Sequence, residues 1–235
     1  LHGPAIIAFA DTLVDADFTS LASEKMDAVV WVKPVEDPRR FGVAEVDPSN
    51  LVKRLIEKPQ DIKNNLAIVG LYYFKECQRL CEAIEEQMKR KVSLHGEFYL
   101  VDAVNITLEK GSKMRAQPIG VWLDAGTPDA MLSTNRYLLE HGQDNMADNP
   151  TRPSVSILQP VFIHPDADIS SSVIGPNVSI GSGCHIEGSV LRNSIIDEGA
   201  VVKTVVIEDS ILGRNVRVTG SPNHLNLGDL THVDL

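Results

Sequence analysis

The sequence predicts an α/β domain followed by a parallel β-helix, because the spacing of apolar residues changes once along the chain. Early in the chain, short apolar runs typical of strands alternate with segments whose apolar residues recur at helical spacing. From residue 163 to residue 218, Ile, Val and Leu instead recur in successive groups, with six positions between the members of each group. A polar stretch rich in Asn, Asp and Pro lies between the two patterns. We therefore expect a first domain over residues 1–141, a linker over residues 142–154 and a second domain over residues 155–235.

The composition indicates a globular chain with an acidic surface. Of its 235 residues, 43% are hydrophobic and 23% are charged, which is ample for a buried core. The 22 Lys and Arg against 32 Asp and Glu give a net charge of −10, which argues against nucleic acid or an anionic membrane as the main partner. Three cysteines without a Cys-x-x-Cys pair argue against a disulfide framework or a zinc site. Since the sequence shows no apolar run of membrane-spanning length and no signal peptide, we expect a cytoplasmic protein.

The first half of the α/β domain is predicted to consist mostly of strands. Residues 4–10 form a near-continuous apolar run, which predicts a strand buried on both faces of a parallel sheet, with Asp11 at its carboxyl end. The turn residues 47–50 predict a hairpin. The other expected elements are a short helix over residues 15–27, a buried strand over 28–32, hairpin strands over 41–46 and 51–56, and a strand over 67–74.

The second half of this domain is predicted to be mostly helical. We expect helices over residues 75–91, from residue 95 to Gly111, and from residue 128 to about residue 141, with a strand over 114–123 that ends at Asp124. Thr127 is a suitable N-cap and Gly142 a suitable stop for the last helix. Cys77 and Cys81 share one face of the first helix, and we interpret them as core thiols.

The period of six fits neither a helix nor simple strand alternation. It is typical of a hexapeptide-repeat, left-handed parallel β-helix, here of about three coils. The apolar positions that define it are Ile163 and Ile169; Ile174, Ile180 and Ile186; Val190, Ile196 and Val202; and Val206, Leu212 and Val218.

Four charged residues stand where strands are predicted to end. Asp11 and Asp124 each follow a strand and precede a turn, so the two carboxylates could share one hard divalent ion with phosphate oxygens. In Glu57-Lys58-Pro59, an acceptor and a cation follow another strand and could bind a small polar ligand. The alternatives stay open from the residues alone: a helix or turn cap for either aspartate, and an ordinary charged strand end for the triplet.

The ordered set of motifs resembles the sugar-1-phosphate nucleotidylyltransferases, most closely the long-form glucose-1-phosphate thymidylyltransferases. The resemblance covers nearly the whole chain, including residues 225–233. It implies a Rossmann-like nucleotidyltransferase domain with a mixed sheet, followed by the β-helix. The motifs are Phe41-Gly42-Val43-Ala44, Glu57-Lys58-Pro59, residues 65–72, residues 96–102 and Trp122-Leu123-Asp124-Ala125-Gly126-Thr127.

The resemblance also implies an activity and its residues. The family reaction transfers a nucleotidyl group from a nucleoside triphosphate, dTTP being favoured here, to a sugar-1-phosphate, with glucose-1-phosphate favoured. Pyrophosphate is released. In this sequence, Asp11 and Asp124 would hold Mg²⁺ and Lys58 would neutralise the sugar phosphate. The sugar would contact the Glu57 carboxylate, the backbone of Gly42 and Val69, and the wall formed by Trp122.

The sequence departs from the family pattern in three places. Ala10 stands where a glycine usually precedes the metal-binding aspartate, and His95 stands where an arginine usually helps to hold the sugar phosphate. The Gly-rich loop that cradles the triphosphate does not occur in residues 1–235. We therefore expect the chain to be a fragment without the N-terminal part of that domain, and to be inactive by itself.

Two alternatives to the enzyme remain. Related chains of this fold serve as non-catalytic regulatory or assembly subunits. Some hexapeptide β-helices are acetyltransferases with a catalytic histidine, which would make the protein bifunctional, and His164, His185 and His224 are available. Because a short solenoid leaves its ends and faces free, we expect a homo-oligomer with contacts made by residues 155–235.

Overall fold

The computed structural model describes residues 2–91, 96–145 and 154–221. The chain forms two compact units, Leu1–Gly126 and Thr127–Leu235. Most of the predicted linker, together with His95, His224 and the C-terminal motif, lies outside the described residues.

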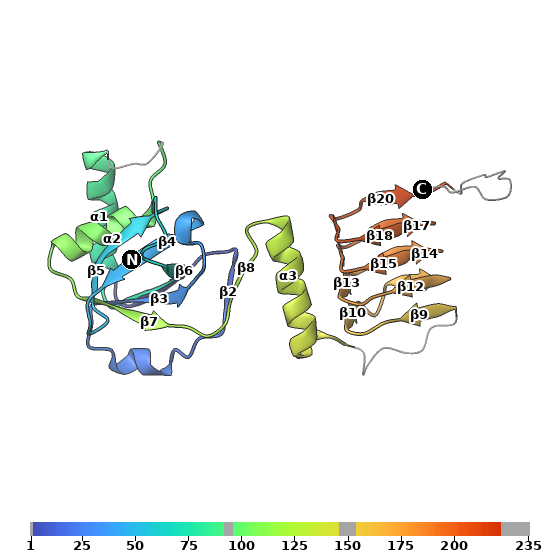
Figure 1. Cartoon of the computed structure of the whole chain (residues 1–235), viewed down its shortest axis with the longest axis horizontal. Helices are drawn as coiled ribbons and strands as arrows, with labels where there is room; N and C mark the ends of the chain where they lie inside the picture. Colours follow the sequence, from blue (N-terminus) through green and yellow to red (C-terminus); the bar gives the residue numbers. More distant parts are fainter. Residues whose placement is uncertain (1, 92–95, 146–153, 222–235) are drawn as a thin grey trace. The chain divides into compact units, whose positions relative to one another are not determined.

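The first unit contains a six-stranded mixed sheet in the order β5-β4-β6-β3-β7, with β1 also paired to β6 (Figure 1). The β3–β7 pair is parallel and the other pairs are antiparallel, as expected for a mixed sheet. The strands are β1 (Ala5–Ala8), β3 (Ala28–Pro34), β4 (Gly42–Val46), β5 (Val52–Glu57), β6 (Leu66–Phe74) and β7 (Met114–Pro118). A separate antiparallel pair is formed by β2 (Thr12–Val14) and β8 (Trp122–Asp124).

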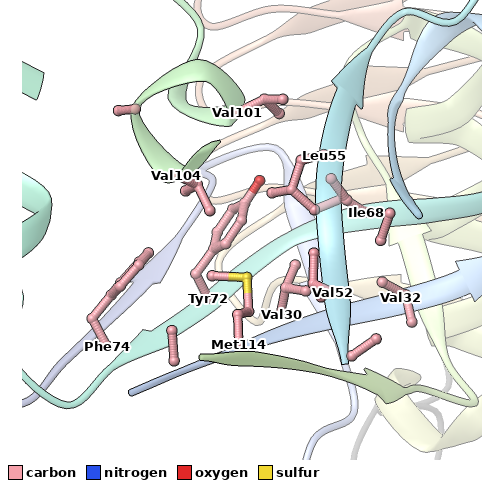
Figure 2. Close-up of a cluster of buried hydrophobic side chains, with 14 of the residues drawn as sticks. Val30, Val32, Val52, Leu55, Ile68, Tyr72, Phe74, Val101, Val104 and Met114 are labelled. Atoms are coloured by element: carbon pink, nitrogen blue, oxygen red, sulfur yellow. The ribbon is translucent and has the colours of Figure 1, made fainter. Parts of the chain in front are cut away.

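The central strands are buried on both faces, which explains their continuous apolar sequence. On one face, alternate residues of β3 and β6 pack against helices α1 (Cys77–Arg90) and α2 (Leu100–Glu109). Figure 2 shows the side chains of β3, β5, β6, β7 and α2 that meet in this core. On the other face, residues such as Trp31 and Leu71 pack under Leu21 and Trp122. The buried strand, the hairpin and the strand near residues 67–74 are thus where the sequence predicts them.

Side-chain hydrogen bonds fix the hairpin that carries Glu57. The Asp47 carboxylate accepts from the backbone N–H of Ser49 at 2.8 Å and of Leu51 at 3.0 Å, and so closes the turn between β4 and β5. On β5, the amide of Asn105 from α2 bonds both the N–H and the C=O of Leu55, at 2.8 Å each. Hence β5 is anchored between its hairpin partner and a helix, and its end at Glu57 has a defined position.

The structure corrects three predictions for the first unit. The first strand is not buried in a parallel sheet: β1 is antiparallel to β6, alternate residues are half-buried, and Ile6 is 48% exposed. The short helix expected over residues 15–27 is confined to the 3-10 helix η1 (Thr19–Ser23), and the Asp17 carboxylate accepts from the Thr19 N–H and hydroxyl at its start. The strand over 114–123 divides into β7 and β8, because the chain leaves the main sheet after Pro118 and pairs with β2 from Trp122 onward.

Over residues 154–221, the second unit is a parallel β-solenoid with three four-stranded sheets, so this part has four coils rather than about three (Figure 1). The strand orders are β10-β13-β16-β19, β11-β14-β17-β20 and β18-β15-β12-β9, and the handedness of the coil stays a prediction. The strands are β9 (Val155–Ile157), β10 (Val161–Ile163), β11 (Asp168–Ser170), β12 (Ser172–Ile174), β13 (Val178–Ile180), β14 (His185–Glu187), β15 (Val190–Arg192), β16 (Ile195–Ile196), β17 (Val201–Lys203), β18 (Val206–Glu208), β19 (Ile211–Leu212) and β20 (Arg217–Thr219).

The six-residue period places apolar residues of most strands in the solenoid core, but it is wrong at Val190 and Val206, where the next residues, Leu191 and Ile207, pack inward and Val206 is 77% exposed. Ile169, Ile186 and Val202 stack in register on successive coils, and Ile186 is fully buried. Buried serines form hydrogen bonds with backbone groups at the corners between strands. The Ser172 hydroxyl donates to the Ser170 carbonyl at 2.7 Å and accepts from the Ser189 N–H at 3.1 Å, and Ser189 repeats the arrangement one coil on. The period of six does not predict this serine ladder.

Helix α3 (Pro128–Leu138) belongs to the second unit, although the sequence-based boundary lies at residue 141. The Asn135 amide donates to the Asn177 carbonyl at 3.3 Å and accepts from the Ser179 hydroxyl at 2.6 Å. After the helical turn η3 (Leu139–Gln143), Asn145 bonds both backbone groups of Ile163. Thr127 caps α3, and Gly142, at φ +87°, ends the helical segment, as predicted. Among the described residues, no helix is both long and apolar enough to cross a membrane.

Candidate active site

A cavity of about 330 Å³ opens in the first unit, at the edge where β4, β5 and β6 meet the β2–β8 pair. Its lining comes from segments that lie far apart in the sequence. Six of the seven predicted site residues line it: Asp11, Gly42, Glu57, Val69, Trp122 and Asp124. Lys58, the seventh, is exposed and bonds to a side chain of the lining.

Asp11 and Asp124 are brought together by the short β2–β8 pair. Thr12 lies opposite Asp124 in that pair, and the Ala125 N–H donates to the Asp11 carbonyl at 2.9 Å. A Cβ placed on Gly126 would lie 3.2 Å from Asp124 Oδ1 and 3.4 Å from Asp11 Oδ2, so one carboxylate oxygen of each residue faces the same small space. The two aspartates can therefore supply two oxygen ligands to one hard cation.

These two carboxylates do not form a complete metal site by themselves. In residues 2–91, 96–145 and 154–221, no group of three or more His, Cys, Asp and Glu side chains is placed to hold a metal ion. A divalent ion bound between Asp11 and Asp124 would thus take its other ligands from water or from substrate phosphates, which is common for Mg²⁺. The donor set fits such an ion.

Gly42 and Glu57 face each other across the hairpin and define the cavity floor. They are direct partners in the β4–β5 ladder. A Cβ at residue 42 would lie 3.1 Å from Glu57 Oε2 and 3.2 Å from both Ile68 Cδ1 and Val101 Cγ2. A glycine at this position therefore keeps room around the Glu57 carboxylate.

Burial raises the pKa of Glu57 above the ordinary value for a glutamate. The charge of Lys58 opposes this shift, and the charge of Asp102 on α2 adds to it. Tyr72, a cavity neighbour, is buried, and its pKa is also raised by desolvation. Glu57 is therefore a carboxylate in a partly apolar site, where a hydrogen bond to a ligand hydroxyl is stronger than in water.

Lys58 lies next to the cavity and contacts Tyr99. Its Nζ donates to the Tyr99 hydroxyl at 3.0 Å and lies 4.9 Å from the centre of the Tyr99 ring. The Tyr99 hydroxyl donates to Glu97 Oε2 at 2.7 Å. The backbone N–H of Lys58 donates to the Phe41 carbonyl at 3.1 Å, and its φ of +43° is in the left-handed region.

Several lining residues were missed from the sequence, most of them aromatic. Phe41 packs edge-on against Trp122 with ring centroids 4.9 Å apart, so Trp122 is held as one wall. Gly70, at φ +75°, lets Phe9 and Thr12 approach closely, because a Cβ there would lie 2.9 Å from each. Phe9 carried no signal of its own in the sequence. Phe41, which opens a motif, and Tyr99, which follows Gly96-Glu97, could have been included by position.

The two described histidines of the solenoid, His164 and His185, are paired with carboxylates. His185 Nδ1 lies 2.9 Å from Asp168 Oδ2, and its Nε2 lies 3.7 Å from Glu187 Oε2. Glu187 also pairs with Lys203 at 2.9 Å. His164 pairs with Asp166. These side chains form a charged ladder on the surface of the solenoid, and the acetyltransferase alternative stays a prediction.

Comparison with known proteins agrees with this geometry. A family model described as nucleotidyl transferase matches residues 5–141, and one described as the GMPPB C-terminal domain matches residues 157–226. A "Glucose-1-phosphate thymidylyltransferase" of Streptomyces antibioticus is 33% identical over 88% of this chain and 64% of its own length. One of Streptomyces griseus is 32% identical over 97% of this chain and 69% of its own length.

The chain belongs to the nucleotidyl transferase family. It spans about two thirds of the length of these two relatives. A solved nucleoside-diphosphate-sugar pyrophosphorylase from Vibrio cholerae RC9 shares the fold, with a TM-score of 0.50 and 20% identity over 57% of this chain and 56% of its own. Members of the family generally use a divalent metal ion, which fits the paired carboxylates of Asp11 and Asp124.

Proposed function

We propose that this chain carries the sugar-phosphate and metal half of a nucleotidyltransferase site. The reaction moves a nucleotidyl group from a nucleoside triphosphate to a sugar-1-phosphate and releases pyrophosphate. One observation supports this proposal most: residues from the start, middle and end of the first unit, Asp11, Glu57 and Asp124, line a single cavity beside Lys58. The two aspartates offer oxygen ligands for a cation. Glu57 offers a hydrogen-bond acceptor and Lys58 an ammonium for a phosphorylated sugar.

The residues of the chain bind and orient the acceptor substrate. The Glu57 carboxylate accepts hydrogen bonds from sugar hydroxyls, and Gly42 and Val69 line the space beside it. Trp122, held by Phe41, covers one face of the sugar. Lys58 neutralises part of the phosphate charge. Because nucleotidyl transfer depends mainly on positioning and charge neutralisation, these contacts suffice for the acceptor side.

Asp11 and Asp124 would hold Mg²⁺ in this proposal. When bound, the ion neutralises phosphate charge and aligns the two substrates. The carboxylates themselves provide the negative charge and the fixed spacing that select a small hard cation.

The favoured substrates are dTTP and glucose-1-phosphate. The support is the name of the two Streptomyces relatives, glucose-1-phosphate thymidylyltransferase. The preference would be tested by pyrophosphate release from dTTP, UTP, GTP and ATP in a longer protein that contains this chain. Equal rates with all four triphosphates would contradict it.

The proposal is tested first by binding, which does not need the triphosphate. Glucose-1-phosphate would be titrated into the 235-residue chain with MgCl₂ by calorimetry. Glu57→Gln should weaken binding by roughly tenfold or more, because hydrogen bonds to a charged group contribute about 1.5–3 kcal/mol. Glu45→Gln is the matched control, since Glu45 lies on the same hairpin but pairs with Arg54 outside the cavity. Equal effects of the two variants, or no binding by the unaltered chain, would contradict the proposal.

The solenoid is proposed to be an assembly element of a cytoplasmic homo-oligomer. Its outer faces include exposed apolar residues such as Val206, at 77% exposure. Its described charged residues pair largely within the solenoid, as in the ladder at His185. The solution mass of the chain and of residues 1–126 alone would test this role. A monomeric chain, or assembly that persists in residues 1–126 alone, would contradict it.

A further inference from the structure

Tyr99 joins two charged residues at the rim of the cavity. Its hydroxyl accepts a hydrogen bond from Lys58 Nζ at 3.0 Å and donates one to Glu97 Oε2 at 2.7 Å. Its ring lies 4.9 Å from the same ammonium, within the range of a cation–π contact. Tyr99 lines the cavity, whereas Lys58 reaches it only through this contact.

Both partners have a fixed backbone. The Tyr99 carbonyl accepts a hydrogen bond at 3.0 Å from the amide of Gln87, which is 2% exposed on α1. Tyr99 is also the residue directly before α2, so two helices hold it. On the other side, the Lys58 N–H is bonded to the Phe41 carbonyl at the end of the hairpin. The geometry of the pair is therefore set by three separate elements.

We propose that Tyr99 is a positioning residue for Lys58, which holds its ammonium at the cavity rim where the phosphate of a sugar-1-phosphate binds. This inference rests on the proposed function and adds a residue to it. A free lysine samples many rotamers, and ordering such a side chain opposes binding. Because Tyr99 orders the Lys58 side chain before the ligand binds, part of this entropy loss no longer opposes binding.

The direction of the hydrogen bonds supports positioning rather than blocking. The hydroxyl proton of Tyr99 goes to Glu97, which turns an oxygen lone pair toward Lys58. An ammonium has three N–H donors, and Tyr99 accepts one of them. Since Lys58 is exposed, its other donors remain accessible to phosphate oxygens. The same hydrogen bond raises the pKa of Lys58, which keeps the side chain charged.

The contact itself is tested without any ligand. Lysines of the folded chain would be acetylated competitively with a limiting amount of acetic anhydride and quantified by mass spectrometry. In Tyr99→Phe, labelling of Lys58 relative to Lys89, an exposed lysine on α1, should rise a few-fold, because the acceptor that restrains the amine is lost. Tyr73→Phe is the matched control, since Tyr73 lies on the other face of β6 in a different core cluster. An unchanged ratio in Tyr99→Phe would overturn the proposal.

The positioning role is tested by a comparison of two ligands. Tyr99→Phe should weaken glucose-1-phosphate binding by roughly two- to tenfold, the range expected for ordering one long side chain, and leave glucose binding unchanged. In Lys58→Met, the Tyr99 change should have no further effect. The proposal would be overturned if Tyr99→Phe weakened the binding of both ligands equally, or if the effects of Tyr99→Phe and Lys58→Met were additive. Either result would mean that Tyr99 contacts the sugar and does not act through Lys58. If the unaltered chain binds no sugar phosphate, the proposed function fails, and the phosphate role of Tyr99 fails with it even where labelling shows the contact.

Discussion

The solenoid and the cavity differ in how far apart in the sequence their contacting residues lie. In the solenoid, His185 contacts Asp168 and Lys203 contacts Glu187, at separations of 17 and 16 residues. In the first unit, Lys58 meets Tyr99 from 41 residues away, and Asp11 meets the Asp124 turn from the other end of the unit. The solenoid repeats one local arrangement, whereas the cavity depends on several elements that must each be placed correctly.

The two regions also differ in how their polar groups are hydrogen-bonded. Solenoid serines such as Ser172 and Ser189 have both hydrogen-bonding roles filled by backbone. At the cavity, Glu57 is partly buried beside apolar residues, with a pKa raised by burial. A carboxylate in such surroundings is typical of a site that completes its hydrogen bonds with a ligand. The solenoid serines are thus satisfied by backbone groups of their own unit, whereas the surroundings of Glu57 suit a ligand.

The largest expected effect is on the solenoid core. Ile186→Ala should lower the free energy of unfolding by about 2–5 kcal/mol, because it opens a cavity between Ile169 and Val202 in a fully buried stack. Val206→Ala, at a 77% exposed position, should change it by less than about 0.5 kcal/mol. Urea denaturation followed by circular dichroism measures both. Similar losses in the two variants would contradict the assignment of Ile186 to the core and of Val206 to the surface.

The next effect concerns the metal. Asp124→Asn should weaken Mn²⁺ binding, measured by electron paramagnetic resonance, on the order of 100-fold, since even residues that only orient metal ligands contribute about 10–100-fold. The hydrogen bond from the Gly126 N–H to Asp124 Oδ1 survives in asparagine, so the fold should be retained. Asp129→Asn, an acid in the first turn of α3, is the control. If Mn²⁺ affinity is unchanged in Asp124→Asn, Asp124 is a structural turn residue and not a metal ligand.

A smaller effect is expected from filling the space beside Glu57. Gly42→Ala should destabilise the first unit by about 1–3 kcal/mol and weaken glucose-1-phosphate binding, because the added methyl meets Glu57, Ile68 and Val101 at 3.1–3.2 Å. Gly120→Ala adds the same atom where nothing lies within 4 Å. Thermal unfolding and calorimetry compare the pair. Equal behaviour would mean that the hairpin relaxes and that Gly42 is not needed for close approach.

The smallest effect is the pH dependence of Glu57. Its folded pKa is raised, so the folded state binds a proton more tightly than the unfolded state, and the Glu57 contribution to stability falls as pH rises from 4.5 through the raised value. Sugar binding, which uses the carboxylate, should instead be lost on acidification with a midpoint above 4.5. Calorimetric titrations and urea denaturation of the wild type and Glu57→Gln between pH 4 and 8 check both signs. A pH profile that is the same in both proteins would assign the dependence to another group.

The sequence anticipated several residues that line the cavity or lie beside it, because they stand at strand ends and carry charge. Asp11, Glu57, Lys58 and Asp124 were identified by that position together with a family resemblance. Tyr99 and Phe9 were missed, since an aromatic residue beside a loop is usually part of a core. The first strand was misassigned because a near-continuous apolar run does not reveal whether its partners are parallel, antiparallel or absent.

By itself, the sequence determined the features that repeat over short distances. The six-residue period requires a solenoid, the turn residues at 47–50 require a hairpin, and Thr127 with Gly142 sets the helical segment between them. Only the tertiary structure decided that β7 and β8 enter different sheets, that α3 packs with the solenoid, and that Tyr99 reaches Lys58. Local patterns follow from backbone geometry and side-chain spacing, which act on neighbours. Contacts between distant segments depend on how all the intervening elements pack, and no local signal in the chain records that.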